Sequence, residues 1–183
     1  MEKLSVDEFI KLEKKDLAGK IVCFPTDTVY GIGALYNDNK AIAKIYEMKN
    51  RPLNKPLANL CSNINQILDL GINIPTNVRD IIDRSWPGAL TIIFAYEQGK
   101  ISFRMPDSIV ALKIIDKFSI MTTTSVNESG EKELNSYSDI EKQFGNIIDY
   151  YISDEHHLTN VASTVIDVSD EVIKIVRQGL VKI

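Results

Sequence analysis

Short runs of apolar residues alternate with polar segments along the chain, and the length of each run indicates the element it forms. Six runs rich in apolar, β-branched or aromatic residues are too short for helices and predict strands. They span residues 20–24, 57–61, 89–96, 101–106, 119–124 and 146–152. Two further predicted strands, ASTVIDV and VIKIVRQG, close the chain and are joined at Ser169-Asp170-Glu171.

Helical periodicity and end signals fall between these runs. Ser5 to Glu8 forms a capping box that begins a first helix, and Gly19 is its expected stop. A second helix runs from Asn37 or Asp38 to about Met48 and ends before Pro52. The remaining predicted helices span residues 63–70, 75–85, 108–118 and 138–144.

Polar or glycine-containing segments join these elements. The stretch FPTDTVYGIGA at 24–34 is interpreted as a loop, Gln98-Gly99 as a turn, and residues 127–138 as a longer polar loop. Helices and strands mix without strict alternation. The pattern therefore predicts one α/β domain over residues 1–183, with a twisted sheet of parallel and antiparallel strands flanked by helices.

Composition narrows the class of protein. The 183 residues carry a net charge of −4 and an isoelectric point near 5.3, which argues against a bulk nucleic-acid coat protein. A local basic cleft remains compatible with that charge. The N-terminus lacks a signal-peptide core and no apolar run has membrane-spanning length, so we expect a cytoplasmic protein. Cys23 and Cys61 are expected to be buried free thiols.

Familiar catalytic signatures are missing from the sequence. There is no GxxxxGK[ST] and no GxGxxG, and Gly31-Ile32-Gly33 is interpreted as a tight turn. His156-His157 is expected to lie in a solvated loop, because no cysteine or carboxylate arrangement completes a metal site. No serine–histidine or cysteine–histidine nucleophile pattern is found.

Cations and small hydroxyls supply the candidate chemistry. Lys49, Arg51 and Lys55 surround two prolines, which would hold them on a stiff turn suited to phosphate oxygens. Arg104 and Arg177 lie near the ends of predicted strands, and the loops are rich in serine and threonine. A solvated charged loop is the alternative for the cation trio. Together the residues predict a pocket for an anionic small molecule without naming it.

Seven motifs, in order, resemble the YrdC-like family of threonylcarbamoyl-AMP synthases in its short single-domain form (TsaC type). They are FPTDTVYGIGA, KNRPLNKPL, WPGALTII, FRMP, TSVNESG, ASTVID and VRQG, and they span residues 24–179. The most specific are Lys-x-Arg at 49–51 and Ser-x-Asn at 125–127. The resemblance implies a YrdC-like fold with a basic concave cleft.

The resemblance also implies a nucleotidyltransferase reaction. L-threonine, bicarbonate and ATP would give L-threonylcarbamoyl-AMP and pyrophosphate, for t6A37 modification of tRNA by downstream threonylcarbamoyltransferase machinery. Magnesium would come with the ATP phosphates, without a dedicated protein metal site. Contact with that machinery would be transient, and weak tRNA binding is compatible with a basic cleft. No membrane partner is implied.

Roles for individual residues follow from the motif positions. Expected catalytic residues are Lys49, Arg51, Ser125 and Asn127; expected ATP-binding residues are Arg51, Lys55, Ser125 and Arg177; expected threonine-binding residues are Thr28, Arg104, Thr123 and Ser163. Arg104 would hold the threonine carboxylate with its planar fork.

Two departures from the family pattern leave alternatives open. Leu60 stands where many relatives carry a histidine, and EKELNS replaces a Ser-Pro pair in the 127–138 loop. A paralogue with another amino-acid substrate, or an inactive one, is therefore a further hypothesis. An RNA-binding module that holds tRNA or double-stranded RNA without chemistry is another, and its binding would depend steeply on salt.

Overall fold

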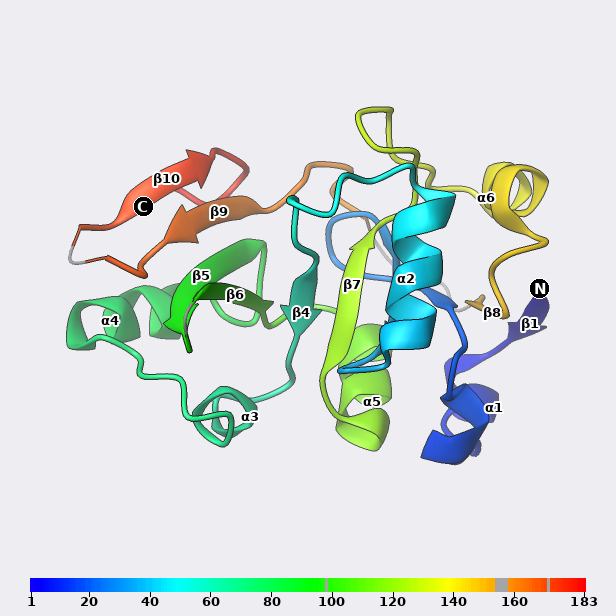
Figure 1. The fold of residues 1–183 in the computed structure, drawn as a ribbon, viewed down its shortest axis with the longest axis horizontal. Helices are drawn as coiled ribbons and strands as arrows, with labels where there is room; N and C mark the ends of the chain where they lie inside the picture. The colour runs from blue at the N-terminus through cyan, green and yellow to red at the C-terminus, as the bar shows by residue number, and fades with distance from the viewer. Residues whose placement is uncertain (98, 154–157, 171) are drawn as a thin grey trace.

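A single mixed sheet forms the centre of the protein (Figure 1). The computed structural model describes residues 1–97, 99–153, 158–170 and 172–183, and its strand order is β1-β8-β2-β3-β7-β4-β6-β5-β9-β10. The strands are β1 Glu2–Leu4, β2 Val22–Pro25, β3 Tyr30–Leu35, β4 Ala58–Leu60, β5 Leu90–Tyr96, β6 Gly99–Arg104, β7 Met121–Ser125, β8 Tyr150–Ile152, β9 Thr164–Asp167 and β10 Lys174–Arg177.

The sheet contains both parallel and antiparallel strand pairs. β8 runs parallel to β1 and β2, β4 runs parallel to β6, and β5 runs parallel to β9. The β2–β3, β3–β7, β4–β7, β5–β6 and β9–β10 pairs are antiparallel. The predicted mixed α/β sheet is thus confirmed.

Helices cover both faces of the sheet. They are α1 Val6–Phe9, α2 Asn39–Met48, α3 Asn65–Leu68, α4 Thr76–Ser85, α5 Ile109–Phe118 and α6 Tyr137–Phe144, with a short 3-10 helix, η1, at Lys14–Leu17. Val22 and Phe24 of β2 pack in the cluster that contains α5, whereas Cys23 packs in the cluster that contains α2. Successive strand residues point to opposite faces, so these two helices lie on opposite sides of β2. A third apolar cluster joins α3 and α4 to β5, β6 and β9.

The interpretation of residues 24–34 as a loop was wrong. Tyr30–Leu35 is a fully buried strand that pairs with both β2 and β7. The glycines permit this close packing, because a Cβ on Gly33 would lie 2.6 Å from Cγ2 of Thr123. Residues 26–29 alone form the turn between β2 and β3.

The first predicted helix is also shorter than expected. The Ser5–Glu8 capping box is confirmed, but the helix ends at Phe9, and Gly19 follows the separate η1 segment. Asp38 caps α2 and Ser108 caps α5, as the sequence predicted. Gln98, His156, His157 and Glu171 lie outside the described residues, so the predictions for them stay predictions.

Both cysteines are buried free thiols, as expected. Burial raises the pKa of Cys23, and raises that of Cys61 to about 12. Within the described ranges, no helix is both long enough and apolar enough to span a membrane.

Candidate active site

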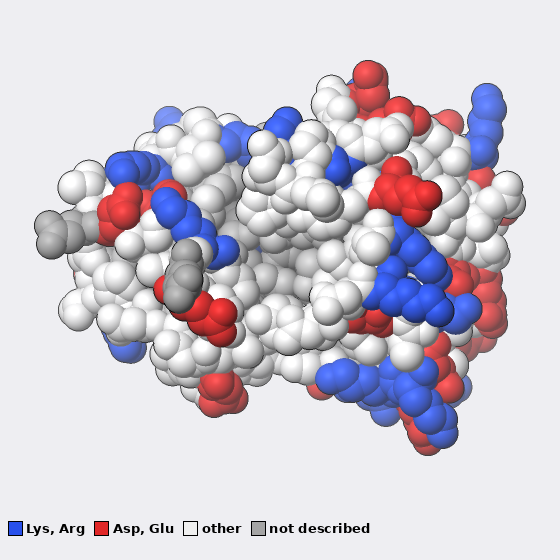
Figure 2. All heavy atoms as spheres, in the orientation of Figure 1, with Lys and Arg blue, Asp and Glu red and all other residues white. Residues whose placement is uncertain are grey.

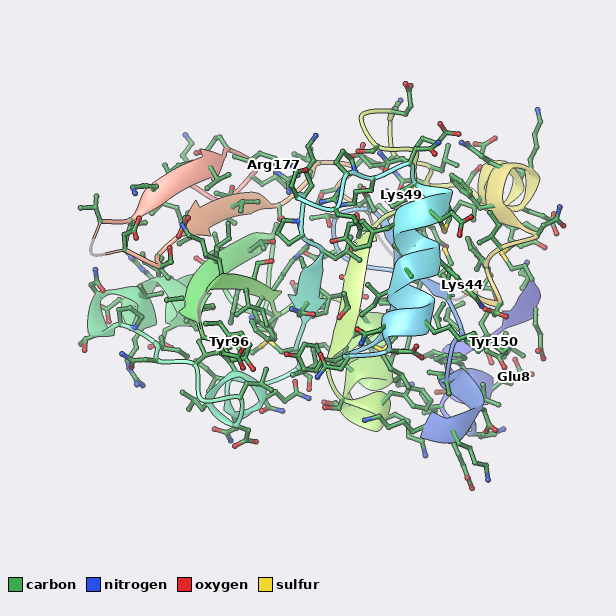
Figure 3. All side chains as sticks on the ribbon, viewed as in Figure 1. Glu8, Lys44, Lys49, Tyr96, Tyr150 and Arg177 are labelled. Atoms are coloured by element: carbon green, nitrogen blue, oxygen red, sulfur yellow. The ribbon has the colours of Figure 1, made fainter. Side chains whose placement is uncertain are left out.

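One pocket of about 530 Å³ gathers most of the residues that the sequence singled out. Its lining includes Thr28, Arg51, Lys55, Arg104, Thr123, Ser125, Ser163 and Arg177. Figure 2 shows one face of the molecule hollowed near its middle, with charged side chains mainly toward the two ends. Figure 3 shows Lys49 at the end of α2 and Arg177 at the end of β10, on either side of the middle. The FPTDTVYG and KNRPLNKP segments are therefore two walls of the same pocket.

The turn between β2 and β3 is tied together by hydroxyls. The Oγ1 of Thr26 donates to the carbonyl of Val29 at 2.7 Å and lies 3.0 Å from the Oγ1 of Thr28. Two main-chain amides outside the turn also donate hydrogen bonds to it: Asn160 to the Thr28 carbonyl and Thr159 to the Asp27 carbonyl. Thr28 is 1% exposed, so its hydroxyl is fixed at the pocket wall.

Arg104, the last residue of β6, is held by three protein acceptors. Its Nε donates to the Gly88 carbonyl at 2.9 Å, its Nη1 to Thr28 Oγ1 at 2.8 Å, and its Nη2 to Asp27 Oδ1 at 2.5 Å. Burial lowers the pKa of Arg104, while the charge of Asp27 opposes that shift. One hydrogen remains on each terminal nitrogen, which suits a bidentate contact with a small carboxylate.

The cationic turn at 51–56 is stiffened by its own arginine. Arg51 Nε donates to the Lys55 carbonyl at 2.8 Å and its Nη2 to the Pro56 carbonyl at 2.9 Å. The main-chain amide of Lys55 also donates to the Pro52 carbonyl. Lys55 itself is exposed and makes no side-chain hydrogen bond or ion pair among the described residues. Its charge is therefore available to an anionic ligand.

Lys49 and Asn127 lie behind the pocket and do not line it. Lys49 is 1% exposed, and its ammonium donates to the Ser125 carbonyl (2.6 Å), the Asn127 carbonyl (2.6 Å) and Asn127 Oδ1 (2.9 Å). Burial, with a smaller contribution from Arg51, lowers the pKa of Lys49 to about 8. All three ammonium donors are engaged, so Lys49 positions the Ser125–Asn127 segment. Ser125 Oγ in turn donates to Asn127 Oδ1 at 2.6 Å.

The opposite wall carries a second fixed arginine. Arg177 Nε donates to the Ser163 carbonyl at 3.0 Å, and its Nη2 to Ser163 Oγ at 3.2 Å. Ser163 Oγ also lies 2.8 Å from Thr91 Oγ1. Ser163, which precedes β9, and Arg177, the last residue of β10, are therefore joined by hydrogen bonds.

Sequence reasoning assigned no role to three residues that contribute to this site. Asp27 pairs with Arg104, Glu133 lines the pocket, and Lys100 lines it while pairing with Asp167 at 2.7 Å. Leu60, noted as a departure, lines the pocket and is 4% exposed. The available signals were the position of Asp27 in the quoted motif and that of Glu133 in the EKELNS segment, whereas nothing in the spacing placed Lys100.

The arrangement has two chemically distinct parts. Arg104 and Thr28 offer a buried fork and a hydroxyl for a small carboxylate, and Arg51, Lys55 and Arg177 offer charge for a polyanion. Among the described residues, no group of three His, Cys, Asp or Glu side chains could hold a metal ion. The fold and pocket therefore define an α/β domain with a cavity lined by five cations and several hydroxyls.

Comparisons with known proteins identify the family. Residues 17–179 match the Sua5/YciO/YrdC family model, described as telomere recombination, and the chain belongs to this family. The chain is 35% identical to a putative threonylcarbamoyl-AMP synthase of Methanocaldococcus jannaschii, covering 100% of this chain and 89% of that protein. It is 32% identical to threonylcarbamoyl-AMP synthase of Bacillus subtilis over 87% of this chain, and spans 50% of that longer protein.

A solved structure shares the fold. The crystal structure of Pyrococcus abyssi Sua5 complexed with L-threonine superposes with a TM-score of 0.85 at 28% identity. The match covers 97% of this chain and 56% of the Pyrococcus chain.

Proposed function

We propose that this protein is an L-threonylcarbamoyladenylate synthase. It condenses L-threonine, bicarbonate and ATP, and releases pyrophosphate. The observation that carries the proposal is the joining, in one pocket, of the Arg104–Thr28 pair with the Arg51–Lys55 turn and Ser125. The names of the relatives, and the threonine bound to Pyrococcus Sua5, support the same activity.

The amino-acid half of the pocket is the turn between β2 and β3 together with the end of β6. The free hydrogens of the Arg104 fork bind the threonine carboxylate, and Thr28, Thr123 and Ser163 supply hydroxyls nearby. Asp27 and Gly88 hold the guanidinium in a fixed plane before substrate arrives. A preorganised fork lowers the ordering cost of binding.

The nucleotide half lies along the cationic turn. Arg51 and Lys55 bind the ATP phosphates, Ser125 lies near both substrates, and Arg177 contacts the nucleotide from the opposite wall. Magnesium enters as part of the nucleotide substrate and neutralises part of its charge.

The reaction needs positioning more than a protein nucleophile. Threonine's amine forms a bond to the carbon of bicarbonate and water leaves, which gives an N-carboxylate. A carboxylate oxygen then attacks the α-phosphorus while the bond to pyrophosphate breaks. Negative charge builds on the phosphate oxygens, and fixed cations stabilise it without reorganising. Lys49 and Asn127 act from behind by holding Ser125 in place. The product then passes, in the cytoplasm, to a tRNA-modifying transferase.

Pyrophosphate release from ATP tests this function. Release is expected only when L-threonine and bicarbonate are both present. No release above background with both would overturn the proposal. Because Leu60 lines the pocket, serine is assayed beside threonine; release with serine alone would change the substrate and keep the reaction class.

A further inference from the structure

Glu133 is the one acidic side chain among the described residues that line the pocket. The lining contains five cations: Arg51, Lys55, Lys100, Arg104 and Arg177. The negative charge of the Glu133 carboxylate repels any polyanion that enters the pocket. We therefore ask whether Glu133 discriminates between polyanionic ligands of different charge.

The backbone holds Glu133 at this position. On one side, Asn127 Nδ2 donates to the Glu131 carbonyl at 2.8 Å. On the other side, the amide of Leu134 donates to the Val126 carbonyl at 2.8 Å, and the Leu134 side chain packs against the apolar cluster that contains α2 and α6. Glu133 lies between these two attachments, is half-buried and lines the pocket.

The charge of Glu133 acts on one cation behind the pocket and on one that lines it. Its field acts on Lys49 behind the pocket and on Arg177 across it. Among the described residues, its carboxylate accepts no hydrogen bond and makes no ion pair closer than 4.0 Å. The negative charge of Glu133 is therefore free to interact with a bound ligand.

On the basis of the proposed function, we propose that Glu133 is a specificity residue that makes the pocket select metal-bound nucleotide over metal-free nucleotide. A bound divalent cation cancels about half of the negative charge of the ATP phosphates. The repulsion from Glu133 grows with the charge that remains, so it acts most strongly on metal-free ATP. The cations attract both forms, and the carboxylate supplies the difference.

Calorimetric titration of ATP into the intact protein tests this inference. ATP is titrated once with excess magnesium and once with a chelator, in the absence of threonine. The variants are Glu133→Gln, which removes the charge at nearly constant shape, and Glu133→Lys, which reverses it. Glu131→Gln is the matched control, because Glu131 is exposed on the same loop and does not line the pocket.

The expected result is a larger change for metal-free ATP than for magnesium-bound ATP. Glu133→Gln should bind metal-free ATP about tenfold more tightly, or about 1.4 kcal/mol, with a smaller gain for magnesium-bound ATP. Glu133→Lys should extend the trend, and Glu131→Gln should match the wild-type ratio. An unchanged ratio in both Glu133 variants would overturn the inference. So would weaker binding of magnesium-bound ATP alone, because that result would make Glu133 a metal ligand.

The inference and the proposed function fail separately in this design. Threonine-dependent pyrophosphate release is measured on the same wild-type preparation. Release with an unchanged binding ratio overturns the inference alone. A shifted ratio without release overturns the synthase activity and keeps the role of Glu133 in nucleotide selection.

Discussion

Replacing Lys49 with methionine removes the buried ammonium that fastens the Ser125–Asn127 segment. The substitution keeps the length of the side chain but eliminates three hydrogen bonds of 2.6, 2.6 and 2.9 Å. Hydrogen bonds to charged groups contribute about 1.5–3 kcal/mol each, so the lost bonds sum to about 4.5–9 kcal/mol.

An opposing contribution comes from the burial of the charge. The pKa of Lys49 falls from 10.5 to about 8, which corresponds to about 3 kcal/mol at about 1.4 kcal/mol per unit. Methionine removes that cost. The expected net loss in free energy of unfolding is therefore about 2–6 kcal/mol.

The pH dependence gives this prediction a second signature. Because the folded-state pKa lies below the unfolded value, the unfolded chain binds more protons between about pH 8 and 10.5. The wild-type protein should therefore gain stability over Lys49→Met as the pH rises through this window, with no change in the difference below it.

Urea denaturation followed by the fluorescence of Trp86 measures both effects. Lys132→Met, at an exposed position of the 127–138 loop, is the control and should stay within about 0.5 kcal/mol of wild type. If Lys49→Met also stays within that range, and its difference from wild type is flat from neutral to alkaline pH, the assignment of Lys49 as an internal fastener is refuted.

Three further substitutions separate the parts of the site. Arg104→Lys keeps the positive charge but loses the planar guanidinium fork. The loss of about 1.5–3 kcal/mol of binding should raise KM for threonine at least tenfold, while KM for ATP changes less. An unchanged KM for threonine would contradict the binding of the threonine carboxylate by Arg104. Arg51→Ala should weaken ATP binding by about 1.5–3 kcal/mol in calorimetry. Wild-type ATP affinity in this variant would show that Arg51 stabilises the 51–56 turn and does not contact ATP. Gly33→Ala should cost about 1–3 kcal/mol in denaturation, because the new Cβ would lie 2.6 Å from Thr123 Cγ2, whereas Gly99→Ala, with 4.0 Å to its nearest neighbour, should be nearly neutral.

Local signals in the sequence predicted most elements of the fold. The runs at 89–96 and 119–124 became β5 and β7, and the caps at Asp38 and Ser108 were correct. These features depend on neighbouring residues, which sequence patterns describe well.

Long-range packing explains what the sequence did not predict. In the sequence, the glycines of β3 look like those of a turn. The structure shows that β7 lies beside β3 and leaves no room for a side chain at Gly33. The Arg104–Asp27 ion pair joins residues 77 positions apart, so no spacing could indicate it. Likewise, Lys49 belongs to an apparently exposed charged run, and only the folded loop that surrounds it accounts for its burial.

The most direct test of the central claim is the composition of the nucleotide product. The protein is incubated with ATP, magnesium, labelled threonine and labelled bicarbonate, and the nucleotides are separated and examined by mass spectrometry. The proposed function predicts an adenylate that carries both labels, formed in equal amount to pyrophosphate. Pyrophosphate release that leaves AMP, or another adenylate without threonine's label, would contradict it.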